Sequence, residues 1–193
     1  MDKRFDIHTV TAIVIGTIII IITNYYMHLS SSFSKEWIVQ ICSAVVIVIA
    51  AVTGTVSGFL MPLVSSMIVG IALMGFDVTV EFLILALFGI STGHYMEKLG
   101  VRKGEFNGIR IIDFCMLQIM LSIIAWICVY PLSDFYTYGR DLRETLNLGV
   151  FHCGISIIIE LCICLPVLIL CNRLFRQKRL VEDAQREYLY DRK

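Results

Sequence analysis

Three polar residues at one-turn spacing within an apolar stretch are the first candidates for chemistry. His152, Ser156 and Glu160 are four residues apart at each step, so on a helix they share one face. A carboxylate in such a stretch is costly to bury and usually faces a cavity or a partner. The stripe predicts either one wall of a polar cavity that opens at the outer end of the helix, or a hydrogen-bonded packing stripe.

A second polar series precedes it in the chain. Gln118, Ser122 and Trp126 are also four residues apart, and Trp126 predicts either a core side chain or the wall of a ligand site. Glu81 is a further carboxylate at the start of an apolar run, and predicts either an interface charge or a site residue.

Aromatic residues near the ends of the apolar runs form another candidate group. They are Tyr25, Tyr26, Trp37, Tyr130, Tyr136 and Tyr138. Most of them are typical of the aromatic belt at a membrane surface. Trp37 and Tyr136 are the two that we expect to close over a ligand.

Six long apolar runs must position these residues. They cover Ile7–Tyr26, Trp37–Val52, Gly54–Phe76, Val78–Tyr95, Ile111–Tyr130 and Leu146–Asn172. A spanning helix needs about 20 mostly apolar residues, and the mean hydropathy of +0.81 exceeds the usual globular range. We therefore predict an all-α, polytopic integral membrane protein with six transmembrane helices in one domain, 1–193, with a short N-terminal segment 1–6 and a basic C-terminal tail 173–193.

The basic residues predict the orientation. They gather before the first run, between the fourth and fifth runs, and after the sixth: Lys3, Arg4, Lys98, Arg102, Lys103, Arg110, Arg173, Arg176, Lys178, Arg179, Arg186, Arg192 and Lys193. The other loops hold Lys35, Arg140 and Arg143. The positive-inside rule then places both termini in the cytoplasm. The first run is too long for a signal peptide and predicts a retained helix.

Small residues predict a docking surface. Ala12 and Gly16 are four apart, as are Gly54 and Gly58, and such pairs let helices approach closely. Both pairs lie toward the cytoplasmic side, which predicts one face for a partner helix.

Several activities find no support in the sequence. It contains no P-loop, no H-E-x-x-H and no G-x-S-x-G, so active transport would need an external motor. The seven cysteines are scattered without C-x-x-C, and we expect buried thiols acting as small hydrophobes. No metal or cofactor is predicted.

The order and spacing of five segments and one glycine resemble those of a known family. They are Phe5–Gly16 (FDIHTVTAIVIG), Thr53–Leu60 (TGTVSGFL), Leu99–Phe106 (LGVRKGEF), Gln118–Trp126 (QIMLSIIAW), Pro131–Tyr138 (PLSDFYTY) and Gly149. The chain is similar over nearly its full length to the substrate-binding S components of energy-coupling factor (ECF) transporters, a class of ABC importers.

The resemblance implies a six-helix, multi-pass subunit of the bacterial plasma membrane that binds a vitamin-like solute from outside. It would dock on a transmembrane coupling protein driven by two cytoplasmic ATPases, with Ala12, Gly16, Gly54 and Gly58 at the matching docking positions. The sequence departs from the common pattern of this family at three places: Ser65, Ser66 and Gly70, then Val78–Thr79, and the first loop Ser30–Trp37. Cobalamin is the best single substrate candidate. Haem, other cofactors and the pyrimidine precursors of thiamine are the alternatives.

Two rival functions remain open. A membrane enzyme, either an intramembrane protease or a lipid transferase, could use Glu81, His152 and Glu160, although no recognised motif surrounds them. The second rival is a membrane protein that serves in assembly and binds no ligand.

Overall fold

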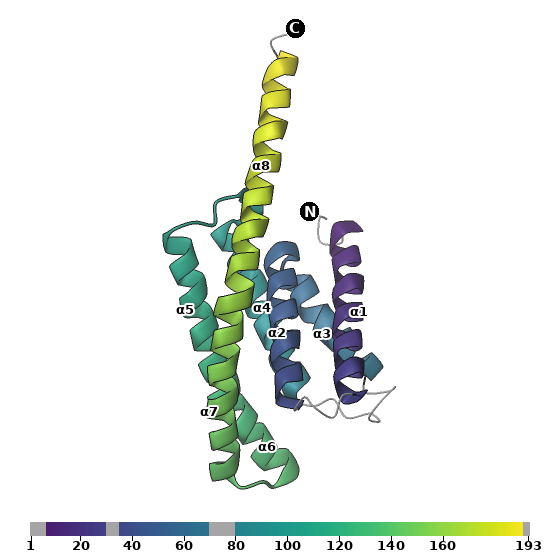
Figure 1. The fold of residues 1–193 in the computed structure, drawn as a ribbon, viewed down its shortest axis with the longest axis vertical. Helices are drawn as coiled ribbons and strands as arrows, with labels where there is room; N and C mark the ends of the chain where they lie inside the picture. The colour runs from purple at the N-terminus through teal and green to yellow at the C-terminus, as the bar shows by residue number, and fades with distance from the viewer. Residues whose placement is uncertain (1–6, 30–34, 70–79, 191–193) are drawn as a thin grey trace.

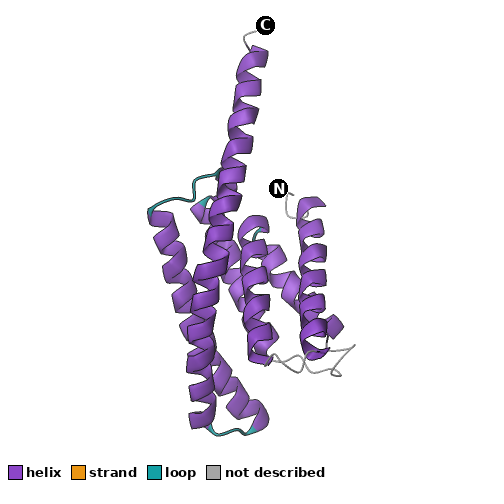
Figure 2. Cartoon of the chain, in the orientation of Figure 1, coloured by secondary structure: helices purple, strands orange, loops and turns teal. Residues whose placement is uncertain are grey.

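The chain forms a bundle of helices with its core between them. A computed structural model describes residues 7–29, 35–69 and 80–190. The first four helices are α1 (Ile7–Leu29), α2 (Lys35–Thr53), α3 (Thr55–Val69) and α4 (Val80–Leu99). A short 3-10 turn, Val101–Lys103, follows α4. Figure 2 shows helices joined by short loops, with no strand in the part that is described, so the predicted all-α class is confirmed for that part.

Two long helical rods complete the bundle. One consists of α5 (Ile109–Ile123), a π-helical segment Ile124–Val129 and α6 (Tyr130–Tyr138). The other consists of α7 (Leu142–Ile159), a π-helical segment Glu160–Cys164 and α8 (Leu165–Tyr190). Both rods are long and apolar enough to cross a membrane, while Thr9–Thr23, Val39–Thr53 and Thr55–Val69 are shorter apolar helices.

The helices pack as two groups. α2, α3 and α4 contact one another, α1 packs against α2 and α3, and the two rods pack against α2 and α4. α1 begins and α8 ends toward the same end of the molecule, and α8 extends beyond the other helices there (Figure 1). Each predicted run overlaps one of these helices or rods where it is described, but the last two helical rods continue past the predicted ends, to Tyr138 and to Tyr190. Six membrane crossings with both termini inside remain a prediction.

The cysteines depart in part from the expectation. Cys42, Cys153 and Cys164 are buried, as predicted, and Cys115 and Cys171 are half-buried. Cys128 and Cys162 are exposed on their helices, so the expectation of buried thiols is wrong for these two. Within the described ranges, no group of histidine, cysteine and carboxylate side chains is arranged to hold a metal ion.

Candidate functional site

Glu160 lies at the centre of a buried hydrogen-bond network. Its side chain is fully buried, and each carboxylate oxygen accepts one hydroxyl hydrogen bond. Ser122 Oγ donates to Oε2 over 3.0 Å, and Ser156 Oγ donates to Oε1 over 2.6 Å. No described lysine or arginine forms an ion pair with Glu160. The two predicted series, on α5 and α7, therefore meet at this carboxylate.

An aromatic cluster continues the network toward the α6–α7 turn. Trp126 Nε1 donates to Ser156 Oγ over 3.3 Å, and the indole stacks on His152 with ring centroids 4.9 Å apart and planes 20° apart. Tyr130 lies beside both rings, at 5.7 Å from Trp126 and 5.5 Å from His152. Polar contacts and ring contacts thus link Glu160, Ser156, Trp126 and His152 in one chain.

Two glutamines make further buried hydrogen bonds, and the first of them brings α2 into contact with this network. Gln40 Nε2 lies 3.3 Å from His152 Nδ1. The amide nitrogen can donate to a ring nitrogen that carries no proton. Gln118 Nε2 donates to Thr92 Oγ1 over 3.0 Å. The carbonyl oxygens of both glutamines are buried with no hydrogen-bond partner among the described residues, so each can still accept a hydrogen bond.

The two π-helical segments place the site residues, and prolines explain both segments. Pro131 and Pro166 lack an N–H and clash with the carbonyl four residues earlier. That earlier residue is Ile127 in one rod and Cys162 in the other, and each lies inside a π-helical segment. Trp126 belongs to the first segment and Glu160 to the second. Such segments often occur at functional sites.

A close helix contact holds the rods together at the same level. Gly149 of α7 packs against the backbone oxygen of Trp126, leaving no room for a side chain there. This contact brings α7 against the first π-helical segment, so that His152 can stack on Trp126.

Four of the predicted site residues are therefore brought together: Trp126, His152, Ser156 and Glu160. In this structure they are buried and hydrogen-bonded, and their role in substrate binding stays a prediction. Tyr136 lies apart on α6, 80% exposed, and contacts Phe135. The side chains of Trp37 and Glu81 lie outside the described residues.

Sequence reasoning missed Gln40 and Thr92 and treated Tyr130 as a belt residue. Gln40 stands alone in the apolar run of α2, and a single buried amide there was a usable signal. The prolines were a second signal, because each marks a local break in helix geometry close to a predicted site residue.

The small residues of the predicted docking face lie largely inside the subunit. Gly16 packs against Met61 and Ile49, and Gly58 packs against the backbone of Gly89. Gly54 is buried at the break between α2 and α3, with a φ of 103°. Ala12 is half-buried. Three of the four positions thus contact this chain's own helices, and the docking role stays a prediction.

Comparisons with known proteins agree with the resemblance. Residues 4–174 match a family model described as "ECF-type riboflavin transporter, S component". Relatives named "UPF0397 protein" include one from Lacticaseibacillus casei (strain BL23), 23% identical over 77% of this chain and 80% of that protein. Another, from Clostridium perfringens (strain SM101 / Type A), is 25% identical over 80% of this chain and 82% of its own length. No solved structure matches the chain significantly.

The family match covers most of the chain, and the family consists of membrane-embedded transporter subunits that bind substrate and are not enzymes. The predicted resemblance is confirmed and the enzyme alternative is wrong. This chain belongs to the S-component family of ECF-type transporters.

Proposed function

We propose that this S component captures a planar heteroaromatic vitamin from outside the cell, with riboflavin as the first candidate. Members of the family act with a membrane coupling protein and two ATPases, and the captured vitamin would be released by docking on that coupling protein. The family description names riboflavin, which ranks it above the cobalamin expected from the sequence.

The aromatic cluster beside an unpartnered acceptor is the observation that carries the proposal. Trp126, His152 and Tyr130 bring three aromatic rings into contact, and Gln40 Oε1 has no partner among the described residues. Ligand sites combine apolar and aromatic walls with a few polar groups of this kind. A ring system that carries an N–H donor could stack on the cluster and donate to Gln40.

The site is closed in this structure, so substrate entry requires the rings to separate. A flat ring system needs a smaller opening than the bulky cobalamin, which is a second reason to prefer riboflavin. Trp37, Glu81 and Tyr136 are proposed to complete the outer part of the site, and Ser156 and Glu160 are proposed to hold Trp126 in place.

The proposed orientation has six crossings with both termini in the cytoplasm. The basic residues of the loop after α4 and of α8 support it, because both gather at the end where α1 begins (Figure 1). The proposed docking face is now centred on Ala12, which is only half-buried, with Gly16, Gly54 and Gly58 shaping the helices behind it.

The test is a binding measurement on the purified subunit. Isothermal titration with riboflavin, cobalamin and the hydroxymethyl pyrimidine precursor of thiamine is compared between wild type and Trp126→Leu. We expect tight riboflavin binding that the variant loses, while a control, Phe59→Leu at an exposed aromatic of α3, keeps it. Binding of cobalamin or the pyrimidine alone would replace riboflavin as substrate, and no change in Trp126→Leu would place the site elsewhere.

A further inference from the structure

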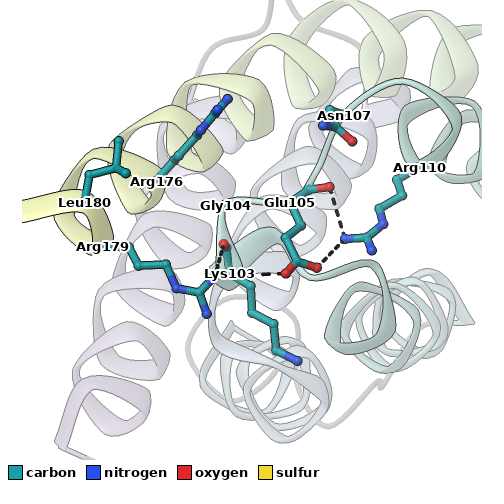
Figure 3. Close-up of a pocket in the computed structure, with 8 residues that line it drawn as sticks. All are labelled: Lys103, Gly104, Glu105, Asn107, Arg110, Arg176, Arg179 and Leu180. Atoms are coloured by element: carbon teal, nitrogen blue, oxygen red, sulfur yellow. Dashed lines mark hydrogen bonds and ion pairs between the residues drawn. The ribbon is translucent and has the colours of Figure 1, made fainter. Parts of the chain in front are cut away.

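A basic hollow lies at the end of the bundle where α8 leaves the other helices. It has a volume of about 460 Å³ and is lined by Lys103, Gly104, Glu105, Asn107, Arg110, Arg176, Arg179 and Leu180. Figure 3 shows Glu105 between Arg110 and Arg179, with Arg176 projecting from α8. Four cationic side chains thus surround one carboxylate, and the hollow carries a net positive charge.

The cations are only partly neutralised. Arg110 Nη1 pairs with Glu105 Oε2 at 2.8 Å, and Arg179 Nη1 lies 4.0 Å from Oε1. The hydrogen bond and the charge of Arg110 hold the pKa of Glu105 below its usual value, so this carboxylate stays ionised at neutral pH. Arg176 forms no ion pair with any other residue that the structure describes, and its charge is available to an anion.

The loop that forms the hollow is held rigidly on α8. Asn172 accepts a hydrogen bond from the Phe106 N–H and donates one to the Phe106 carbonyl, each over 3.0 Å. The Phe106 ring is buried and packs edge-on against Phe114 at 6.0 Å. Gly104 has a φ of 67° and lies against the Arg176 backbone, where a side chain has no room. The cations are therefore positioned before any anion binds.

Apolar side chains descend from the hollow along the two helices that flank it. Ile109, Ile112 and Met116 are exposed on α5, as are Leu170 and Leu174 on α8. The chain changes from apolar to basic between Asn172 and Arg173, which is where a bilayer passes from hydrocarbon to polar headgroups. The hollow thus combines a basic site large enough for a phosphate group with these exposed apolar side chains of α5 and α8, called here the apolar track.

We propose that this hollow binds the phosphate headgroup of an anionic phospholipid of the inner leaflet, with the acyl chains along α5 and α8. Basic pockets between membrane helices on the cytoplasmic side suit such headgroups, and arginine suits phosphate through its planar donor fork. An acidic segment of a protein partner fits the charge but leaves the apolar track unexplained. The inference rests on the proposed orientation.

The test measures lipid retention by native mass spectrometry of the full-length subunit. Phosphatidylglycerol and phosphatidylcholine with the same acyl chains are titrated against wild type, Arg176→Gln and the double variant Arg176→Gln/Arg179→Gln. Each arginine near a membrane surface contributes enough for roughly a five-fold change in binding. We expect phosphatidylglycerol retention to fall about that much per arginine removed. Arg143→Gln, a matched charge loss at the opposite end of the bundle, should change nothing.

Three outcomes would overturn the inference. They are equal retention of both lipids, phosphatidylglycerol retention that the arginine variants leave intact, and equally strong binding of soluble glycerophosphate, which would assign the hollow to free phosphate esters. If a variant fails to fold, the wild type alone still tests the inference. Its preference for phosphatidylglycerol must weaken as the salt concentration rises, because salt screens the attraction between arginine and phosphate. The assay needs no substrate, so its failure is distinguishable from failure of the proposed transport function.

Discussion

At the scale of single residues, the most informative group is a carboxylate held by two hydroxyls. Glu160 accepts from Ser122 and Ser156, and Ser156 in turn accepts from the Trp126 indole. A buried carboxylate without a described cation needs such donors, because an unpaired polar group inside the membrane is costly. Glu160 therefore acts on the aromatic cluster through Ser156.

Glu160→Gln tests this relay. We expect the fold to persist, because glutamine keeps the shape and a hydroxyl can either donate or accept. Substrate binding should weaken by about 1–3 kcal/mol, the typical cost of a lost partner in a buried network. Isothermal titration measures it, with Glu144→Gln at an exposed position of α7 as the control. Unchanged affinity in both Glu160→Gln and His152→Ala, with monodisperse protein, would mean that the network is purely structural.

At the scale of elements, two prolines shape the rods that carry the site. Each π-helical segment contains the residue whose carbonyl the following proline disturbs, and each carries one site residue. The same scale explains the small residues. Gly16 and Gly58 let α1 and α3 pack closely against their neighbours in the chain, whereas Ala12 remains partly accessible.

Pro166→Ala separates stability from binding. Proline in a helix interior costs about 3 kcal/mol, so the variant should be at least as stable as wild type by thermal unfolding in detergent. A regular helix would turn Glu160 away from Ser122, and substrate affinity should fall about ten-fold. The control is Ile163→Ala, which changes the same π-helical segment but keeps Pro166. It should bind substrate with wild-type affinity. A Pro166→Ala variant with wild-type affinity would contradict the positioning role.

Ala12→Leu and Gly16→Leu should behave differently. Ala12→Leu should express and bind substrate but fail in uptake, because a larger side chain blocks approach of the partner helix. Gly16→Leu should lose folded protein, because Met61 and Ile49 fill the space and overpacking costs at least 1–3 kcal/mol. Size-exclusion yield and whole-cell uptake measure both effects. Normal uptake by Ala12→Leu would remove Ala12 from the docking face.

At the scale of the whole molecule, the distribution of charge follows the arrangement of the helices. The loop after α4 and the start of the α8 extension meet in one basic hollow. The α6–α7 turn lies at the other end (Figure 1), where Arg140 pairs with Asp134 at 3.1 Å. The two ends thus differ in charge, as the positive-inside rule requires of a membrane protein with one orientation.

Cysteine labelling of intact cells tests this orientation. In a cysteine-free background, a thiol at Thr137 should react with a membrane-impermeant reagent added outside. Thiols at Lys103 and Lys178 should react only after the membrane is opened. All three positions are exposed, so a missing reaction reports sidedness and not burial. Reaction of position 103 from outside would reverse the proposed topology.

Much of the fold was predictable because it depends on local patterns. The length of each apolar run predicts a helix, and the described helices match those runs to within a few residues at most ends. The site was predictable only within each helix. The spacing of His152, Ser156 and Glu160 placed these three residues on one face of their helix. The spacing of Gln118, Ser122 and Trp126 placed those three on one face of another helix.

The sequence by itself determined the helices, the family and the faces that carry polar groups, because these depend on spacing along one chain segment. Only the tertiary structure decided that the two faces meet at Glu160, that Gln40 contacts His152, and that the stripe is closed. It also decided that Gly16 and Gly58 pack inside the subunit. The physical reason is that these contacts join side chains far apart in sequence, and helix spacing does not specify which neighbour a face will meet.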